Sequence, residues 1–463
     1  MGECLHHPET VCPLSLGEIA LVGADHGRYT GLHPTKLGTA VDAAKTTIST
    51  GKGPSRMDLI SSSVSGNGHG NGNGNGTHWS SSDRPARAVQ VGVIGCGYWG
   101  PQLVRNLNDL SEGVLVGVAD QRPERLDYVR QHYPHVRLFS DHTELLASDI
   151  EAVVIATPIR THYELARQAL QAGKHVLVEK PLATRAFEAA ELIRLAEATG
   201  RTLMVGHTFL YNPAVEELRR IVQSGELGRI YYVDSARLSL GLFQRDVNVL
   251  WDLAPHDISI LFYILGSTPL SVSAHGRSYV QPNIHDVAYV EMRFANEVGA
   301  HAHLSWLNPS KVRRMTVVGD RKMLVYDDVS ATEPIRIYDK GVDTPVTDTF
   351  GEFRLSYRYG EVRSPYISWQ EPLKLECEHF LWAVQTGSTP KTDGVQGLQV
   401  VATLEAANYS LANGGMQVPV QVHATSPISE GEEQCVAKDG YVSPAAFLES
   451  ETPPLEDMAP AQP

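Results

Sequence analysis

Short apolar runs alternate with longer amphipathic segments through the first half of the folded region. Segments such as 161–173 and 184–200 have the length and pattern of helices. Continuous runs of Val and Ile suit strands that are buried on both faces of a parallel sheet. The rhythm therefore predicts an α/β domain over residues 86–210. Its five expected strands are 88–95, 114–120, 151–158, 175–181 and 202–208.

A different rhythm begins near residue 211. Longer strands now alternate polar and apolar residues, which is typical of an antiparallel sheet with one covered face. Two closing helices are expected at 373–386 and 394–412, and they can pack back on the first domain. We predict an α+β domain over 211–422 with a large, mainly antiparallel open sheet. Its clearest strands are 230–240, 286–295, 299–307 and 322–328.

Both ends of the chain have compositions that do not support a packed core. Residues 65–78 are almost entirely Gly and Asn, so we interpret 1–85 as a disordered extension with a flexible linker. Residues 423–463 are rich in Pro, Ser and Glu and are expected to form a disordered acidic tail. No apolar run approaches the length of a membrane span, and no secretory signal is apparent. We expect a cytoplasmic protein.

Charge and cysteine content narrow the function classes. The chain has 39 basic and 53 acidic side chains, a formal charge of −14, which argues against binding to nucleic acid or to anionic membranes. Its five cysteines are widely spaced and include no C-x-x-C pair, so neither a disulfide framework nor a metal site is expected. An acidic substrate would need a local basic pocket.

A glycine-rich loop follows the first predicted strand. Gly95, Gly97 and Gly100 fit the pattern G-x-G-x-x-G, with Tyr98 and Trp99 between the last two glycines. The loop joins a strand to a helix, where glycines allow close approach to a pyrophosphate and the helix N-terminus offers free N–H groups. This context predicts a Rossmann dinucleotide-binding domain.

The second strand ends at Asp120, 20 residues after the last glycine of the loop. A carboxylate at that place can accept hydrogen bonds from the adenosine ribose and would repel a 2′-phosphate. We therefore expect NAD, with NADP less favoured. Arg122 keeps the opposite preference open, and Asp120 could also be a simple helix cap.

Glu179 and Lys180 begin an EKP motif at the end of the fourth expected strand, where a parallel sheet opens onto its ligand crevice. Four further motifs accompany it. TPIRTH precedes it at 157–162, and three others come after it: GHTFLYNPAV at 206–215, WDLAPHD at 251–257 and TDGVQGLQVVATLEAA at 392–407. Together with the glycine loop, they make the chain resemble the Gfo/Idh/MocA oxidoreductase family over about residues 88–415.

The resemblance implies a catalytic group of Lys180, Asp252 and His256. Asp252 and His256 are four residues apart at an expected helix start, hence on one face, with Pro255 in the first turn. Imidazole titrates near neutral pH, so His256 could accept a hydroxyl proton while Lys180 stabilises charge on the oxygen. The alternative is that Asp252 only caps the helix.

Other site residues follow from the same resemblance. Thr157, Pro158, His162, Glu179 and Lys180 are expected beside the cofactor, with His162 in a positioning role. Tyr211 and Asn212 match a position that often faces substrate. Asn212 could equally cap the helix that begins at Pro213.

Within the family, three stretches look most like the branch that contains UDP-N-acetylglucosaminuronate 3-dehydrogenases: 248–266, 306–320 and 371–380. Such substrates predict a basic pocket, for which Lys311, Arg313 and Arg314 are candidates. Neighbouring strand residues point to opposite faces, so at most one of Arg313 and Arg314 can reach a given pocket. A solvated surface would explain this cluster equally well.

These expectations define an NAD-dependent dehydrogenase that oxidises a ring hydroxyl, at carbon 3, of a nucleotide-linked or phosphorylated sugar. A free-sugar or inositol dehydrogenase, or a keto-sugar reductase, is the alternative within the family. A dinucleotide sensor without turnover is the alternative from another class, although it would not need Lys180 and His256 together. The open sheet face predicts a homo-oligomer, either a dimer or a tetramer.

Overall fold

The computed structural model describes residues 87–343 and 355–422. The predicted N-terminal extension with its linker and the predicted acidic tail lie outside the described residues. None of the helices within these two ranges is both long and apolar enough to cross a membrane.

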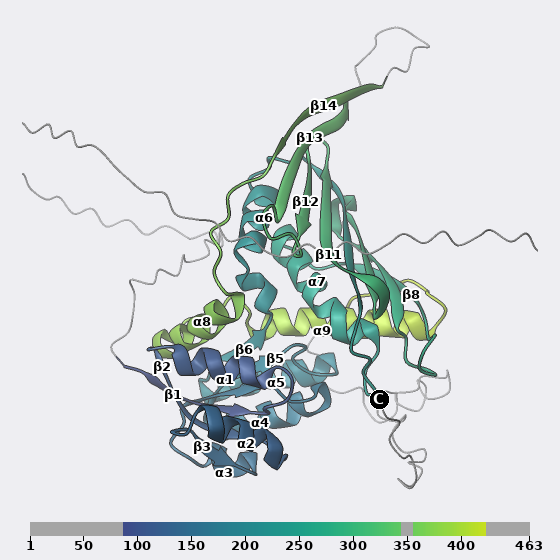
Figure 1. Cartoon of the computed structure of the whole chain (residues 1–463). Helices are drawn as coiled ribbons and strands as arrows, with labels where there is room; N and C mark the ends of the chain where they lie inside the picture. The colour runs from purple at the N-terminus through teal and green to yellow at the C-terminus, as the bar shows by residue number, and fades with distance from the viewer. Residues whose placement is uncertain (1–86, 344–354, 423–463) are drawn as a thin grey trace, which may run out of the picture. The chain divides into compact units, whose positions relative to one another are not determined.

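A six-stranded parallel sheet forms the first half of the fold (Figure 1). Its strand order is β3-β2-β1-β4-β5-β6, the doubly wound order in which strands are added first to one side of β1 and then, from β4 on, to the other. The strands are β1 Val89–Ile94, β2 Gly113–Ala119, β3 Arg137–Phe139, β4 Ala152–Ile155, β5 His175–Glu179 and β6 Leu203–Gly206. The connecting helices are α1 Gly100–Asp109, α2 Pro123–His132, α3 His142–Leu146, α4 His162–Gln171 and α5 Ala186–Thr199.

Helices cover both faces of this sheet, which explains why its strands are continuously apolar. Side chains of α1, α2 and the later helix α8 (Pro372–Thr386) pack on one face, among them Leu103, Val129 and Phe380. Side chains of α3, α4 and α5 pack on the other, among them Leu145 and Leu170.

The second sheet has nine strands in the order β14-β13-β12-β11-β7-β10-β9-β8-β15. Its pairs are antiparallel except β10 with β7, which run parallel. The strands are β7 Ile230–Leu240, β8 Ser271–Arg277, β9 Val287–Arg293, β10 Gly299–Ser305, β11 Leu307–Gly319, β12 Met323–Asp327, β13 Ile335–Asp343, β14 Ser356–Arg363 and β15 Val418–Pro419.

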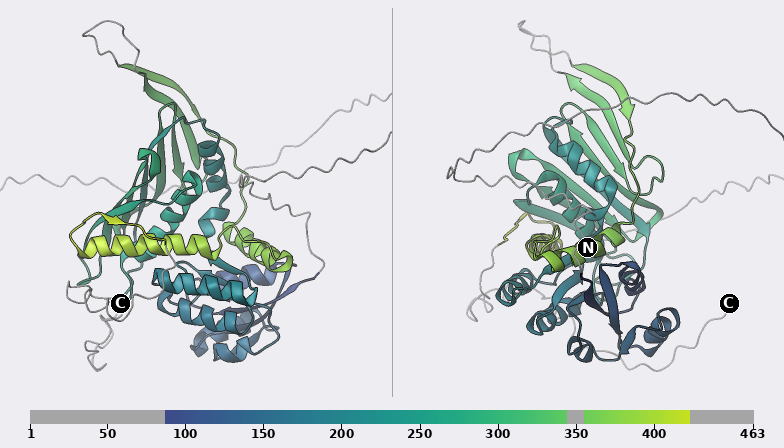
Figure 2. Two further views of the ribbon diagram at one scale, coloured as in Figure 1. Left: turned by 180° about the vertical axis from the view of Figure 1, so that it is seen from behind. Right: turned by 90° about the vertical axis from the view of Figure 1, so that its left-hand side faces the viewer.

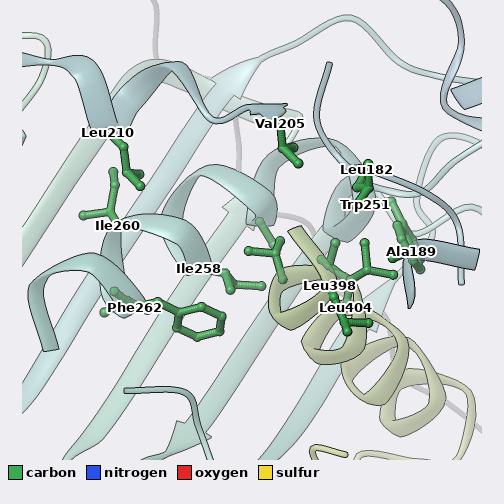
Figure 3. Close-up of a cluster of buried hydrophobic side chains, with 14 of the residues drawn as sticks. Leu182, Ala189, Val205, Leu210, Trp251, Ile258, Ile260, Phe262, Leu398 and Leu404 are labelled. Atoms are coloured by element: carbon green, nitrogen blue, oxygen red, sulfur yellow. The ribbon is translucent and has the colours of Figure 1, made fainter. Parts of the chain in front are cut away.

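Three helices cover one face of the second sheet: α6 Pro213–Gln223, α7 Val249–Leu265 and α9 Gly394–Ala412. Helix α9 contacts both α5 and β8, so it joins the two sheets in one apolar core (Figure 2). Leu398 and Leu404 of α9 lie in a cluster with Leu182, Val205 and Trp251 (Figure 3). Burial of such side chains stabilises the fold by about 1.5–3 kcal/mol each.

The predicted fold class is confirmed: a parallel Rossmann sheet is followed by a large, mainly antiparallel one. Strand β3 escaped prediction because three residues show no periodicity. The two closing helices are present, and α8 begins one residue before its expected start because Pro372 takes the first helical position.

Candidate active site

The glycine loop lies between β1 and α1 with a backbone that only glycine can adopt without clashes. Gly95 has a φ of +93°, and a Cβ there would lie 2.6 Å from the carbonyl oxygen of Ala156. A Cβ at Gly100 would lie 2.4 Å from the carbonyl oxygen of Gly95. The first turn of α1 can therefore approach the loop closely, and its free N–H groups suit a pyrophosphate.

Asp120, directly after β2, is hydrogen-bonded to this loop. It accepts from the backbone N–H of Cys96 at 2.7 Å and from the backbone N–H of Arg122 at 2.9 Å. The Nε of Arg122 lies 3.4 Å from the same carboxylate. Residue Arg122, not Asp120, is at the N-cap of α2, so Asp120 does not cap that helix. These groups fit the adenosine end of a dinucleotide.

Burial, and then the charge of Asp120, raise the pKa of the Cys96 thiol to about 11. The thiol is therefore protonated near neutral pH and is a small packing residue in the loop rather than a nucleophile.

The ends of β4 and β5 are tied together by His162. Its ring nitrogens lie 2.8 Å from the carbonyl oxygen of Pro181 and 2.9 Å from that of Thr157, and burial lowers its pKa. His162 thus fixes the Thr157–Pro158 turn against the EKP turn.

Tyr98 and Trp99 in the glycine loop are exposed, at 81% and 38%.

Lys180 and Asp252 meet where the two sheets adjoin. The Nζ of Lys180 donates to the backbone carbonyl of Asp252 at 2.8 Å and lies 3.7 Å from its Oδ1. The other carboxylate oxygen, Oδ2, accepts from the indole N–H of Trp306 at 2.8 Å. Asp252 is thus held from both sides, and the lysine side chain is 18% exposed.

His256 lies one helical turn beyond Asp252 on α7, with its ring 4.9 Å from that of Phe209 in an edge-on arrangement. Its Nδ1 is enclosed and has no hydrogen-bond partner among the described residues. Burial, followed by the positive charges of Lys180, Arg237 and Arg313, lowers its pKa well below the usual value. The imidazole is therefore neutral at neutral pH and can accept a proton.

Helix α7 begins earlier than we predicted. Asn248 is its N-cap and accepts from the backbone N–H groups of Leu250 and Trp251, so Asp252 is a first-turn residue and not the cap. We expected Pro255 in the first turn of this helix. That prediction is wrong, because α7 begins at Val249 and Pro255 lies inside the helix. Asp252 and His256 nevertheless share one face of α7.

Tyr211, for which we expected a position facing substrate, is enclosed in the protein. It is 4% exposed, and its hydroxyl lies 3.2 Å from Oγ1 of Thr392. Asn212 caps α6 by accepting from Ala214, while its Nδ2 donates to Asp328 at 3.2 Å. The short 3-10 turn η2 (Thr208–Tyr211) ends at Tyr211, and the capping role that we considered for Asn212 is present.

Arg313 and Arg314 point to opposite faces of β11, as their alternation predicts. Arg313 donates to Asp328 at 3.2 Å, and its guanidinium lies 5.7 Å from the ring centre of Phe209. Arg314 lines a hollow of about 480 Å³ on the other face of the sheet, beside His301 and Asp234. Lys311 is exposed.

Sequence reasoning missed Arg237 and Phe209. Arg237 on β7 forms a buried ion pair with Asp257, and its guanidinium lies 4.5 Å from the ring centre of Phe209. The strand alternation that buries Val233 also turns Arg237 inward, and this was the signal available in the sequence. Two guanidinium groups and one ammonium group therefore surround His256.

A cation, a held carboxylate and a neutral imidazole close to a dinucleotide-type loop suit proton transfer coupled to hydride transfer. The fold and the site thus define a two-domain oxidoreductase. Residues 89–207 match the family model for "Oxidoreductase family, NAD-binding Rossmann fold", and residues 215–325 match the "GFO/IDH/MocA C-terminal domain". The chain belongs to the Gfo/Idh/MocA oxidoreductase family.

Similar proteins include several sugar and polyol dehydrogenases. UDP-N-acetylglucosamine 3-dehydrogenase of Acidithiobacillus ferrooxidans is 31% identical over 68% of this chain and 94% of its own length. Inositol 2-dehydrogenase of Rhizobium meliloti is 26% identical over 70% and 97%. The solved structure of the Acidithiobacillus protein, GnnA, aligns with a TM-score of 0.61 at 29% identity, covering 71% of this chain and 98% of that chain.

The WlbA dehydrogenase of Bordetella pertussis, solved with NADH and UDP-GlcNAcA, shares the fold. It aligns with a TM-score of 0.59 at 20% identity, covering 72% of this chain and 99% of that chain.

Proposed function

We propose that this chain is an NAD-dependent dehydrogenase that oxidises the 3-hydroxyl of a UDP-linked sugar. The observation that carries the proposal is the direct contact of Lys180 with Asp252, one helical turn from the neutral His256. The 31% identity to UDP-N-acetylglucosamine 3-dehydrogenase supports this substrate class.

His256 is the group that takes the hydroxyl proton. Its neutral imidazole can accept a proton, and Phe209 holds the ring from one side. Lys180 donates to the same sugar oxygen and stabilises the negative charge that develops as the proton leaves. Asp252, fixed by Trp306, orients the ammonium and can accept from a neighbouring sugar hydroxyl.

The glycine loop, Asp120, the Thr157–Pro158 turn and Glu179 would hold the dinucleotide. Bound NAD supplies the hydride acceptor. Asp120 supports NAD over NADP because its carboxylate would repel a 2′-phosphate.

Positive charge beside His256 supports an anionic substrate over a neutral polyol. Arg237 is paired with buried Asp257, whereas Arg313 pairs with Asp328 through one guanidinium nitrogen and its side chain is 37% exposed. Arg313 therefore has guanidinium donors left for a diphosphate or a carboxylate.

A substrate panel tests this proposal. Purified full-length protein is assayed by NADH absorbance with UDP-N-acetylglucosamine, UDP-GlcNAcA, free N-acetylglucosamine and myo-inositol, each with NAD and with NADP. We expect turnover with a UDP-sugar and NAD, and the product is to be identified as the 3-keto sugar by mass spectrometry and NMR. Turnover of inositol alone would favour the inositol dehydrogenase alternative, and NADH binding without turnover of any polyol would favour a dinucleotide sensor.

We also propose that the protein forms a homo-oligomer through the exposed face of the second sheet. Tyr232, Leu240 and Tyr289 are 39%, 74% and 53% exposed on strands of that sheet. Light scattering coupled to size-exclusion chromatography should give a dimer or a tetramer, and Tyr289→Arg should reduce the mass toward the monomer.

A further inference from the structure

Glu376 is a buried carboxylic acid that the proposed reaction does not use. It lies on α8 with 0% exposure, and its Oε2 accepts from the hydroxyl of Thr208 at 2.8 Å. Its other oxygen, Oε1, is enclosed and has no hydrogen-bond partner among the described residues. A buried carboxylate oxygen without a donor is costly, so its environment needs an explanation.

A second carboxyl group, Glu179 of the EKP motif, faces the same short stretch of chain. Its Oε2 would lie 3.2 Å from a Cβ at Gly206, two residues before Thr208. Glu179 accepts from the backbone N–H of Lys180 at 3.3 Å and from the side chain of Trp99 in the glycine loop. The side chain of Glu179 thus contacts both the catalytic turn and the cofactor loop.

The surrounding groups supply little positive charge to Glu376. Its hydrogen-bond donor is the neutral hydroxyl of Thr208. His207, between Gly206 and Thr208, is 1% exposed, and burial followed by the charge of Lys180 lowers its pKa to about 3, so it is neutral. Lys180 itself is held by Asp252.

We propose that Glu179 and Glu376 share one proton near neutral pH and act as a positioning pair beneath the cofactor loop. One carboxyl is then an acid that donates to the other, directly or through one water, which gives Oε1 of Glu376 its missing partner. The pair would hold the turn of Lys180 and, through Trp99, the glycine loop. The inference goes beyond the proposed function and does not depend on which sugar is oxidised.

The local electrostatics agree with a shared proton. Burial, and then the negative charge of Glu179, raise the pKa of Glu376 well above its usual range. Burial raises the pKa of Glu179 to about 7, while the ammonium of Lys180 opposes this rise. The other titratable groups facing the pair are uncharged near neutral pH, since burial raises the pKa of Tyr211 and of Cys377 and lowers that of His207.

Infrared difference spectroscopy on the apo protein tests the shared proton directly. At neutral pH the wild type should show the carbonyl stretch of a protonated carboxyl group, and this band should disappear as the pH rises and the pair loses its proton. Glu376→Gln should remove the band. The matched control Glu371→Gln also removes one charge from the start of α8, but that carboxylate pairs with Arg105 at the surface and should leave the band unchanged. Absence of the band in the wild type at neutral pH would overturn the proposal.

Binding of NADH provides a second readout. Titrations followed by fluorescence should show wild-type affinity falling about tenfold as the pH rises past the loss of the shared proton, since two adjacent carboxylates repel. In Glu376→Gln the amide is a permanent donor to Glu179, so the affinity should stay within about threefold of wild type and lose its alkaline decline. Glu376→Leu, which has no donor, should bind NADH weakly at every pH.

The unfolding temperature of the apo protein gives the same test without any ligand. A pair that keeps its proton in the folded state stabilises the fold at low pH and loses that contribution as the pH rises through the raised pKa. The difference between wild type and Glu376→Gln should therefore widen in the alkaline range. Equal pH profiles for the two proteins, or a Glu376→Gln that binds NADH as poorly as Glu376→Leu, would contradict a shared proton, whatever the substrate panel returns.

Discussion

Replacing Lys180 by methionine removes the ammonium group and keeps most of the side-chain volume. In the structure this change deletes the hydrogen bond to the carbonyl of Asp252 and the ion pair with its carboxylate. Removal of one preorganised donor at a developing oxyanion raises the barrier by about 2.7–4 kcal/mol. We therefore expect kcat to fall by about 10²- to 10³-fold, while the Kd for NADH stays within about threefold because the glycine loop is untouched.

A second consequence follows for His256. After burial, the charge of Lys180 is the largest cause of its lowered pKa, so Lys180→Met should raise the pKa of the imidazole toward its usual value. A base must be unprotonated to act, and the acid limb of the kcat/KM profile should therefore move to higher pH in the variant. Residual activity measured across the acid range checks the direction of this shift.

Lys174 offers a matched control. Its ammonium also donates to backbone carbonyls, at 3.1 Å to Ser148 and 2.7 Å to Ile150, but Lys174 precedes β5 whereas Lys180 follows it, so the two lysines lie at opposite ends of that strand. Lys174→Met should lower the free energy of unfolding by about 1.5–3 kcal/mol, the usual contribution of a hydrogen bond from a charged group, and should leave kcat unchanged. If Lys180→Met kept full turnover, or if its acid limb moved to lower pH, the assigned role of this lysine would be refuted.

Three other substitutions test neighbouring parts of the site. His256→Asn should lower kcat at least 100-fold with NADH affinity retained, as measured by turnover and fluorescence titration. Trp306→Phe removes the donor to Asp252 and should lower kcat about tenfold, corresponding to about 1.4 kcal/mol, with little change in NADH affinity. Gly100→Ala should abolish NADH binding in the same titration, because the new Cβ would lie 2.4 Å from a backbone carbonyl oxygen; normal affinity would exclude our interpretation of the loop.

Much of the first domain could be predicted from sequence because its signals are local. The run from Val89 to Gly100 contains a strand, a tight loop and a helix start, and each depends on neighbouring residues only. The position of Asp120 at a strand end is also indicated by its neighbouring residues alone. The fold class follows from the strand rhythm, while the shared site of Lys180 and His256 came from the family resemblance and not from any pattern between them.

The remaining site residues depend on pairing between distant strands, which no window of sequence contains. Trp306 contacts Asp252 from 54 positions away, because β10 pairs in parallel with β7 and directs the next residue toward α7. Tyr211 shows a further limit. It ends a 3-10 turn and is 4% exposed, and the motif match indicated its position along the chain but not this burial.

The arrangement of α7 explains how two catalytic groups from different domains keep one geometry. The carbonyl of Asp252 that receives the ammonium of Lys180 belongs to the helical turn that carries His256 four residues later. Movement of this turn would displace the acceptor of the ammonium and the imidazole together, so their separation changes less than the position of either. The N-cap Asn248 fixes where the turn begins, and the carboxylate of Asp252, tied to Trp306, fixes its rotation toward the second sheet. The register of α7 is therefore the structural feature on which the alignment of base and charge donor depends.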